Sequence, residues 1–144
     1  FLLDFPFADC VYAGAFDALR SAAERGSTWI VSDGDVVMQP RKIRRAGLWD
    51  AVQGRVLIFV HKERALHEIE RRCPAQRYVM VDDKIRVLDA VKRQWGDRVR
   101  TVFVRQGHYA LDPAQIRAHP PADRTIEAID RFAALAQTLA GGAQ

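Results

Sequence analysis

The amino-acid sequence predicts an α/β domain, a three-layer Rossmann-like fold in which a parallel sheet carries helices on both faces. Short apolar, β-prone runs alternate with amphipathic segments of roughly ten residues, which is the pattern of βαβ units. Gly, Pro and Asp residues interrupt the chain between these segments. The most distinctive run, Tyr-Val-Met-Val-Asp-Asp-Lys at 78–84, delivers two neighbouring carboxylates to the point where a strand gives way to a helix.

Helical spacing and stop signals define the first half of the chain. Ala15, Ala18, Leu19 and Ala22 fall on one face of a helix that Gly26 ends. The elements expected there are a helix over 14–25, a strand over 28–31, a turn over 32–35, a helix over 40–49, a strand over 55–60 and a helix over 62–72.

The second half has the clearest apolar runs. Val87, Leu88 and Val91 lie on one face of a helix, and the prolines after residue 107 predict a surface loop. The elements expected there are a strand ending at Asp82, a helix over 85–95, a strand over 99–104, a loop over 107–123 and a last helix over 125–139.

The composition is that of an ordinary globular domain. The chain has 144 residues, 49% of them hydrophobic and 28% charged, enough for one domain with its own core. It has no apolar run near the ~20 residues of a transmembrane helix and no signal-peptide layout at its start, so we expect a cytoplasmic protein without a membrane partner. Cys10 and Cys73 are the two cysteines, and without C-x-x-C spacing they indicate neither a disulfide framework nor a zinc site.

The net charge of +4 includes one dense basic cluster, Arg-Lys-Ile-Arg-Arg at 41–45. Such a cluster can bind nucleic acid or an anionic substrate, but on one short helix it is more often a solvated face. No aromatic residue interleaves with it, which argues against nucleic acid. We therefore expect no nucleic-acid partner.

The adjacent carboxylates of Asp82 and Asp83 are candidate metal ligands. Two such groups repel each other unless a hard cation or an ammonium group neutralises them, so the pair indicates Mg²⁺. In an open parallel sheet, the carboxyl ends of the strands form the crevice in which ligands bind. The structural alternative is that Asp82 caps the next helix and Asp83 lies in its first turn.

Polar residues after two other strands suit phosphate binding at the same edge. Ser32 Oγ and the backbone N–H groups of Asp33 and Gly34 can bind phosphate oxygens, and Lys62 can neutralise them. Right-handed crossovers should bring these residues and the acidic pair into one crevice. As alternatives, Ser32 can be a turn hydroxyl and Lys62 a first-turn lysine with a free head group.

Three motifs in this order resemble the haloacid dehalogenase-like (HAD) hydrolases. Val-Ser-Asp-Gly at 31–34, Lys62 in Val-His-Lys-Glu-Arg, and Val-Met-Val-Asp-Asp-Lys at 79–84 resemble the second, third and fourth motifs of that family. The resemblance implies that Ser32 binds phosphate, that Lys62 stabilises charge and that the acidic pair holds Mg²⁺. In the family Mg²⁺ accompanies phosphate-ester hydrolysis, so the resemblance implies a phosphatase with a small phosphorylated substrate.

The first motif of the family, D-x-D-x-[TV] after an apolar strand, has no match in the sequence. Asp4 follows an apolar run, but Phe5-Pro6-Phe7 stands where a second aspartate and a hydroxyl are needed. Asp33 and Asp35 form a D-x-D at the position of the second motif, and we assign no nucleophile to them.

This departure predicts an incomplete core. Residues 1–13 look like the return segment from a cap, and residues 14–144 then form a HAD-like core whose central first strand is missing. We therefore expect the C-terminal part of a longer protein, inactive by itself. Unpaired strands beside the gap would favour self-association.

A second class of function is a non-catalytic or regulatory α/β binding module with a receiver-like acidic metal site. In receiver-like modules the acidic pair follows the first strand and the lysine follows the last, which differs from the order here. The absence of the first motif favours a module that has lost catalysis.

Overall fold

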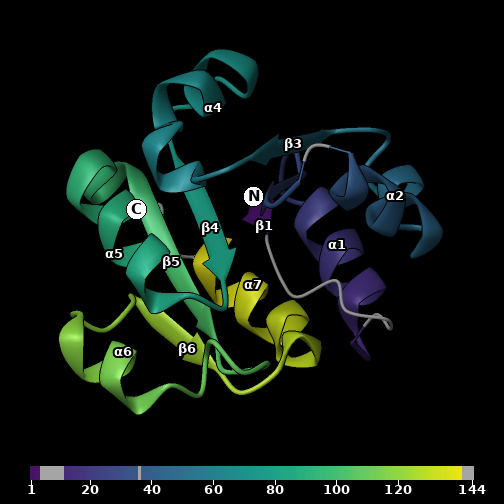
Figure 1. The fold of residues 1–144 in the computed structure, drawn as a ribbon. Coiled ribbons are helices and arrows are strands. Elements are labelled where there is room, and N and C mark those ends of the chain that lie inside the picture. The colour runs from purple at the N-terminus through teal and green to yellow at the C-terminus, as the bar shows by residue number, and fades with distance from the viewer. Residues whose placement is uncertain (4–11, 36, 141–144) are drawn as a thin grey trace.

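A six-stranded parallel sheet forms the centre of the molecule (Figure 1). The computed structural model describes residues 1–3, 12–35 and 37–140. Within them the strand order is β3-β2-β1-β4-β5-β6, and all neighbouring strands are parallel. The strands are β1 (Leu2–Leu3), β2 (Trp29–Asp33), β3 (Val56–Phe59), β4 (Tyr78–Asp82), β5 (Val99–Val104) and β6 (Arg124–Ile126).

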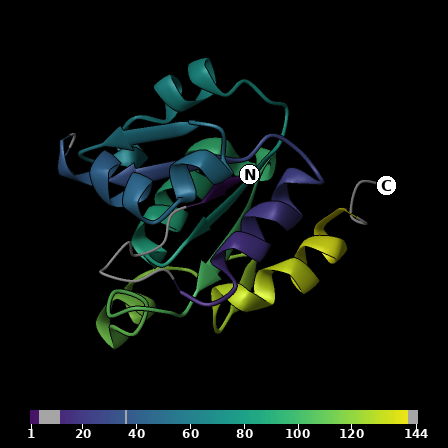
Figure 2. The ribbon, with the colours of Figure 1, turned by 90° about the vertical axis from the view of Figure 1, so that its right-hand side faces the viewer.

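Helices cover both faces of this sheet. On one face α1 and α7 lie side by side, as Figure 2 shows, and α4 and α5 pack on the other. Among the described residues, no helix has both the length and the apolar character needed to cross a membrane. The helices are α1 (Ala15–Ala23), α2 (Met38–Arg45), α3 (Leu48–Ala51), α4 (Leu66–Arg72), α5 (Ile85–Trp95), α6 (Pro113–Ala118) and α7 (Phe132–Ala140), with 3₁₀ turns η1 (Lys62–Arg64), η2 (Gly96–Arg98) and η3 (Ile129–Arg131).

The core consists of two apolar layers, one on each side of the sheet. Successive strand residues point to opposite faces, so in β4 Met80 joins the layer under α4 and α5, while Val81 joins the layer under α1 and α7. Both residues are fully buried. Burial on both faces explains why the strands appear in the sequence as continuous apolar runs rather than alternating ones.

The predicted α/β class and several element boundaries are confirmed. The strand ending at Asp82, the helix over 85–95 and the strand over 99–104 agree with β4, α5 and β5. Four residues predicted to share the inner face of the first helix are all buried in α1: Ala15, Ala18, Leu19 and Ala22.

Several predicted boundaries are wrong. β2 extends through Ser32 and Asp33, because these residues pair with Ile58 and Phe59 of β3 instead of beginning a turn. The helix expected over 40–49 is two helices, since Gly47 adopts a φ of 77° between α2 and α3. The helix expected over 62–72 likewise divides into η1 and α4.

Two elements in the last third of the chain were not predicted. The loop expected over 107–123 contains α6, which begins where the Asp112 carboxylate accepts a hydrogen bond from the Ala114 N–H at 3.0 Å and Pro113 takes the first helical position. The last predicted helix begins too early, because residues 124–126 form the edge strand β6 beside β5.

The prediction that the central strand is missing from this chain is wrong for this structure. β1 lies between β2 and β4, with Leu3 paired to Ile30 on one side and Val81 on the other. Two apolar residues thus satisfy backbone groups that a gap would have left unpaired. The expected self-association depended on such a gap. Because β2 and β4 both pair with β1 at Leu2 and Leu3, that reason for self-association does not apply there.

The remainder of the predicted return segment lies mostly outside the described residues. Residues 1–3 and 12–13 are the only described parts of the range 1–13, and Asp4 belongs to the part that is not described. The proposal that this range returns from a cap therefore stays a prediction.

Candidate active site

A buried ion pair joins the ends of two strands at the carboxyl edge of the sheet. Lys62 begins η1 just after β3, and its Nζ lies 2.6 Å from Oδ2 of Asp82 at the end of β4. Both side chains are 0% exposed, and the same Nζ lies 3.5 Å from the Val31 carbonyl oxygen. Removing both charges from water is costly, and the attraction between them offsets that cost only when their geometry is good and further hydrogen bonds satisfy their remaining polar atoms.

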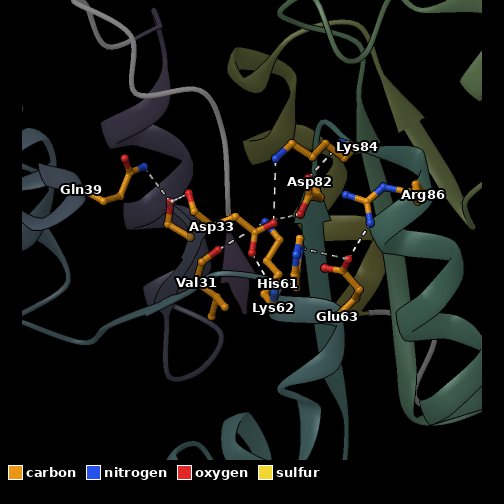
Figure 3. Close-up of polar contacts among 10 residues, drawn as sticks. Val31, Asp33, Gln39, His61, Lys62, Glu63, Asp82, Lys84 and Arg86 are labelled. Atoms are coloured by element: carbon orange, nitrogen blue, oxygen red, sulfur yellow. Dashed lines mark hydrogen bonds and ion pairs between the residues drawn. The ribbon is translucent and has the colours of Figure 1, made fainter. Parts of the chain in front are cut away.

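Asp33 connects β2 to this pair through the backbone of η1. Its Oδ1 accepts a hydrogen bond from the Lys62 N–H at 2.7 Å, and its Oδ2 lies 3.9 Å from Nζ of Lys84 (Figure 3). The carboxylate therefore positions the turn that carries Lys62. From the sequence, the backbone N–H of Asp33 was expected to bind phosphate and its carboxylate was noted only as part of a D-x-D, so this role was not predicted. The signal available was an acidic residue at one strand end and a lysine just after the next strand.

Asp82 accepts a hydrogen bond through its other oxygen. The Lys84 N–H donates to Oδ1 at 2.9 Å, just before the first turn of α5. Oδ2 is buried and, among the described residues, has the ion pair with Lys62 but no hydrogen bond of good geometry. Asp83 is also buried, next to it in sequence. Asp82 therefore retains acceptor capacity through Oδ2, at the positive end of a helix.

Ser32 and Gly34 are less available to a ligand than predicted. Ser32 is buried, and its Oγ accepts a hydrogen bond from Nε2 of Gln39 in α2 at 2.8 Å. The Gly34 N–H donates to the Phe59 carbonyl oxygen at 3.0 Å. This N–H already extends the pairing of β2 with β3, so phosphate binding by it would require that bond to open, and its role stays a prediction.

An open cleft of about 500 Å³ lies at the same edge. Its wall includes Asp33, Lys84 and Arg86 together with His108 and Tyr109 from the segment after β5. Tyr109 is one of the exposed large hydrophobic residues of the molecule, with 49% of its surface accessible. The buried ion pair is not part of the cleft wall. From the sequence, a surface loop was predicted over 107–123 and no role was assigned to Tyr109.

A second ion pair stiffens the rim of the cleft. Arg86 Nη1 donates to Oε1 of Glu63 at 2.5 Å, and His61 Nδ1 lies 4.0 Å from the same oxygen. Partial burial, the largest single influence, raises the pKa of Glu63. The hydrogen bonds from its own backbone and from Arg86, with the charges of Arg86 and His61, outweigh burial and lower that pKa below its usual value. Glu63 is therefore an anion that holds Arg86 in place.

Asp82 and Asp83 are compatible with a magnesium ion that would also be bound by water and substrate. Among residues 1–3, 12–35 and 37–140, no three His, Cys, Asp or Glu side chains gather into a metal site. Mg²⁺ does not require such a site, because it is commonly bound by one or two carboxylates with water and substrate phosphate oxygens. Asp82 and Asp83 would supply those carboxylates, and Oδ2 of Asp82 lacks a well-formed hydrogen bond.

The sequence and fold are similar to those of a solved protein. The chain is 58% identical to a protein assigned as a haloacid dehalogenase-like hydrolase from Burkholderia xenovorans LB400, with a TM-score of 0.86 over 92% of this chain and 60% of that one. The chain belongs to the haloacid dehalogenase-like hydrolase superfamily. It spans less than two thirds of this relative's length, 60%.

A second comparison supports the HAD-like fold alone. A haloacid dehalogenase-like family hydrolase from Xanthomonas campestris is 20% identical, with a TM-score of 0.67 over 90% of this chain and 54% of that one. No protein-family model matches the HAD-like chain, and no curated protein matches it.

The geometry brings most of the predicted site residues together. Lys62, Asp82 and Asp33 are linked by the contacts above, and Asp83 is buried beside them. Ser32 precedes Asp33, but its described hydrogen bonds lead to Gln39 and to the Asp33 carbonyl oxygen. The predicted convergence is thus observed, while the catalytic and metal-binding roles remain proposals.

Proposed function

We propose that this chain forms the core of a Mg²⁺-dependent phosphatase that acts on a small phosphate ester. The observation that carries the proposal is the fully buried Lys62–Asp82 pair at the carboxyl edge, with Asp83 next to it. A lysine and two carboxylates buried at the ligand-binding edge of a parallel sheet are costly for stability, and such costs are typical of functional sites.

Each residue would contribute differently to phosphoryl transfer. Asp82 and Asp83 would hold Mg²⁺, which when bound neutralises charge on the phosphoryl oxygens. Lys62 would supply fixed positive charge without having to reorganise, because Asp33 and Asp82 already position it. Ser32 would offer its hydroxyl to a phosphate oxygen after rotation from Gln39. The 500 Å³ cleft would admit the organic part of the ester.

The expected reaction passes through a covalent intermediate. An aspartate attacks phosphorus, the alcohol leaves with a proton, and water then hydrolyses the aspartyl-phosphate. This sequence does not identify the attacking aspartate, and the chain covers 60% of its solved relative, so we assign the activity to the complete natural protein.

Hydrolysis of p-nitrophenyl phosphate by the complete protein tests the proposal. We expect turnover with MgCl₂, loss of turnover with EDTA, and a decrease of roughly 10²–10³-fold for Asp83→Asn, since removing one charge-stabilising group has effects of that order. Asp97→Asn is the matched control, because Asp97 is an exposed carboxylate in η2, away from the site. Turnover that survives EDTA and is equal in both variants would exclude the proposed reaction.

The second candidate is a binding module without catalysis. The direct contact of Lys62 with Asp82 favours it, because the two charges already neutralise each other. A receiver-like module fits less well, since here the lysine follows β3 and the acidic pair follows β4. Binding of Mg²⁺ by the complete protein without turnover of any phosphate ester would favour this candidate.

A further inference from the structure

The cleft has two walls of different chemistry. Lys84 and Arg86 stand at the start of α5, while His108 and Tyr109 come from the segment after β5. Val60, which follows β3, exposes an apolar surface to the same cleft. A cleft that combines a few charged groups with aromatic surface is typical of a site for a small organic ligand.

Three described cationic side chains in or near the cleft, Lys62, Lys84 and Arg86, differ in how tightly carboxylates bind them. Lys62 is fully buried and bound to Asp82. Arg86 is bound to Glu63. Lys84 is held more loosely, because its Nζ is 3.9 Å from Oδ2 of Asp33, beyond hydrogen-bond distance, and 23% of its side chain is exposed. Among these three cations, Lys84 can therefore meet an incoming anion with the least rearrangement.

The aromatic wall is positioned by the same lysine. Nζ of Lys84 lies 4.7 Å from the centre of the Tyr109 ring, in a cation–π contact. The Tyr109 and His108 rings are 4.0 Å apart at an angle of 35°. Because Tyr109 stays half-exposed while held from two sides, its free surface is preorganised for another planar group.

We propose that Lys84 binds the anionic group of the substrate in this cleft and that the His108 and Tyr109 rings carry its planar organic part. The substrate would then be a phosphate monoester of an aromatic or heteroaromatic alcohol. This inference rests on the proposed phosphatase function, to which it adds a substrate class and a specificity-determining pair, Lys84 and Tyr109.

Calorimetric binding of two stable phosphonates to the complete protein in MgCl₂ tests the inference without requiring turnover. Phenylphosphonate should bind roughly tenfold more tightly than methylphosphonate, because ring stacking and apolar contact act only on the former. Tyr109→Leu should remove this preference by weakening phenylphosphonate binding to the level of methylphosphonate binding. Lys84→Gln should weaken both ligands by roughly tenfold, and Lys84→Arg should keep most of the affinity.

Lys42→Gln is the control for loss of one lysine charge, since Lys42 is exposed on α2. It should leave both affinities unchanged. Equal affinity for the two phosphonates, or unchanged binding in folded Lys84→Gln, would overturn the inference. If the predicted pattern appears but p-nitrophenyl phosphate is not hydrolysed, the binding site stands and the proposed catalysis fails.

Discussion

Opposite edges of the sheet carry two Lys–Asp pairs that differ in what surrounds them. At the carboxyl edge, Lys62 and Asp82 lie 2.6 Å apart and are fully buried. At the amino edge, Lys92 and Asp123 lie 2.9 Å apart with over a third of each side chain exposed. Both pairs connect elements far apart in sequence, so the difference lies in burial and in hydrogen bonding.

At the amino edge, one oxygen of Asp123 is held by several protein groups. Oδ2 of Asp123 accepts from Lys92 Nζ and from the Thr101 N–H, both at 2.9 Å, and Thr101 Oγ1 accepts from the Asp123 N–H. The Asp82 oxygen that contacts Lys62 has no hydrogen bond of good geometry among the described residues. The amino-edge pair thus fastens β6 to β5. The carboxyl-edge pair is costly for stability, and the ligand-binding role proposed for this edge would account for that cost.

The largest expected effect comes from breaking the buried pair. Lys62→Met should lower the free energy of unfolding by about 3–5 kcal/mol, because it leaves the Asp82 charge buried with its main partner removed. Urea unfolding followed by circular dichroism measures this loss. The double variant Lys62→Met/Asp82→Leu should regain most of the stability, since an apolar pair needs no desolvated charge. A loss below about 1 kcal/mol for the single variant would show that the pair is not buried as described.

A smaller effect is expected at the amino edge. Asp123→Asn should lower the free energy of unfolding by about 1 kcal/mol, because the exposed ion pair contributes little and one hydrogen-bond acceptor remains. The same urea experiment measures it. A loss as large as that of Lys62→Met would contradict the distinction between the two edges.

The smallest expected effect is a pH dependence of the stability difference between the wild type and Asp123→Asn. Partial burial, the largest influence, raises the pKa of Asp123, but the hydrogen bonds from Thr101 and Lys92 and the Lys92 charge bring it below its usual value. The unfolded chain therefore takes up a proton first as pH falls, so the contribution of Asp123 is complete above an unfolded pKa of about 3.9 and declines below it. Thermal unfolding from pH 6 to pH 2 should show the wild type and Asp123→Asn converging in stability. A gap that widens toward acid would reverse the sign.

Element boundaries were predicted correctly where an apolar run that becomes buried is flanked by clear turn residues. β4, α5 and β5 each combine an apolar run with clear turn residues, and their boundaries were predicted correctly. The approach of Lys62 to Asp82 also followed from the sequence, because right-handed crossovers force parallel strand ends to one edge.

The errors came from contacts between segments distant in sequence. β6 has one buried residue, Ile126, and is a strand because it pairs with β5, which no local pattern reveals. β1 is only two residues long and depends on strands at both sides. The Asp33 carboxylate and the Tyr109 ring gained roles only because η1 and the segment after β5 approach them in space. By contrast, the Asp112-Pro113 start of α6 was a local signal that could have been recognised.

Titration of Mg²⁺ into the complete protein tests most directly whether the carboxyl edge is the ligand-binding edge. Asp82→Asn and Asp83→Asn should each weaken Mg²⁺ binding by roughly tenfold or more, because each removes a charged oxygen ligand, while Asp123→Asn should bind as the wild type does. Equal Mg²⁺ affinity in all three variants would contradict the account, since the acidic pair would then hold no metal.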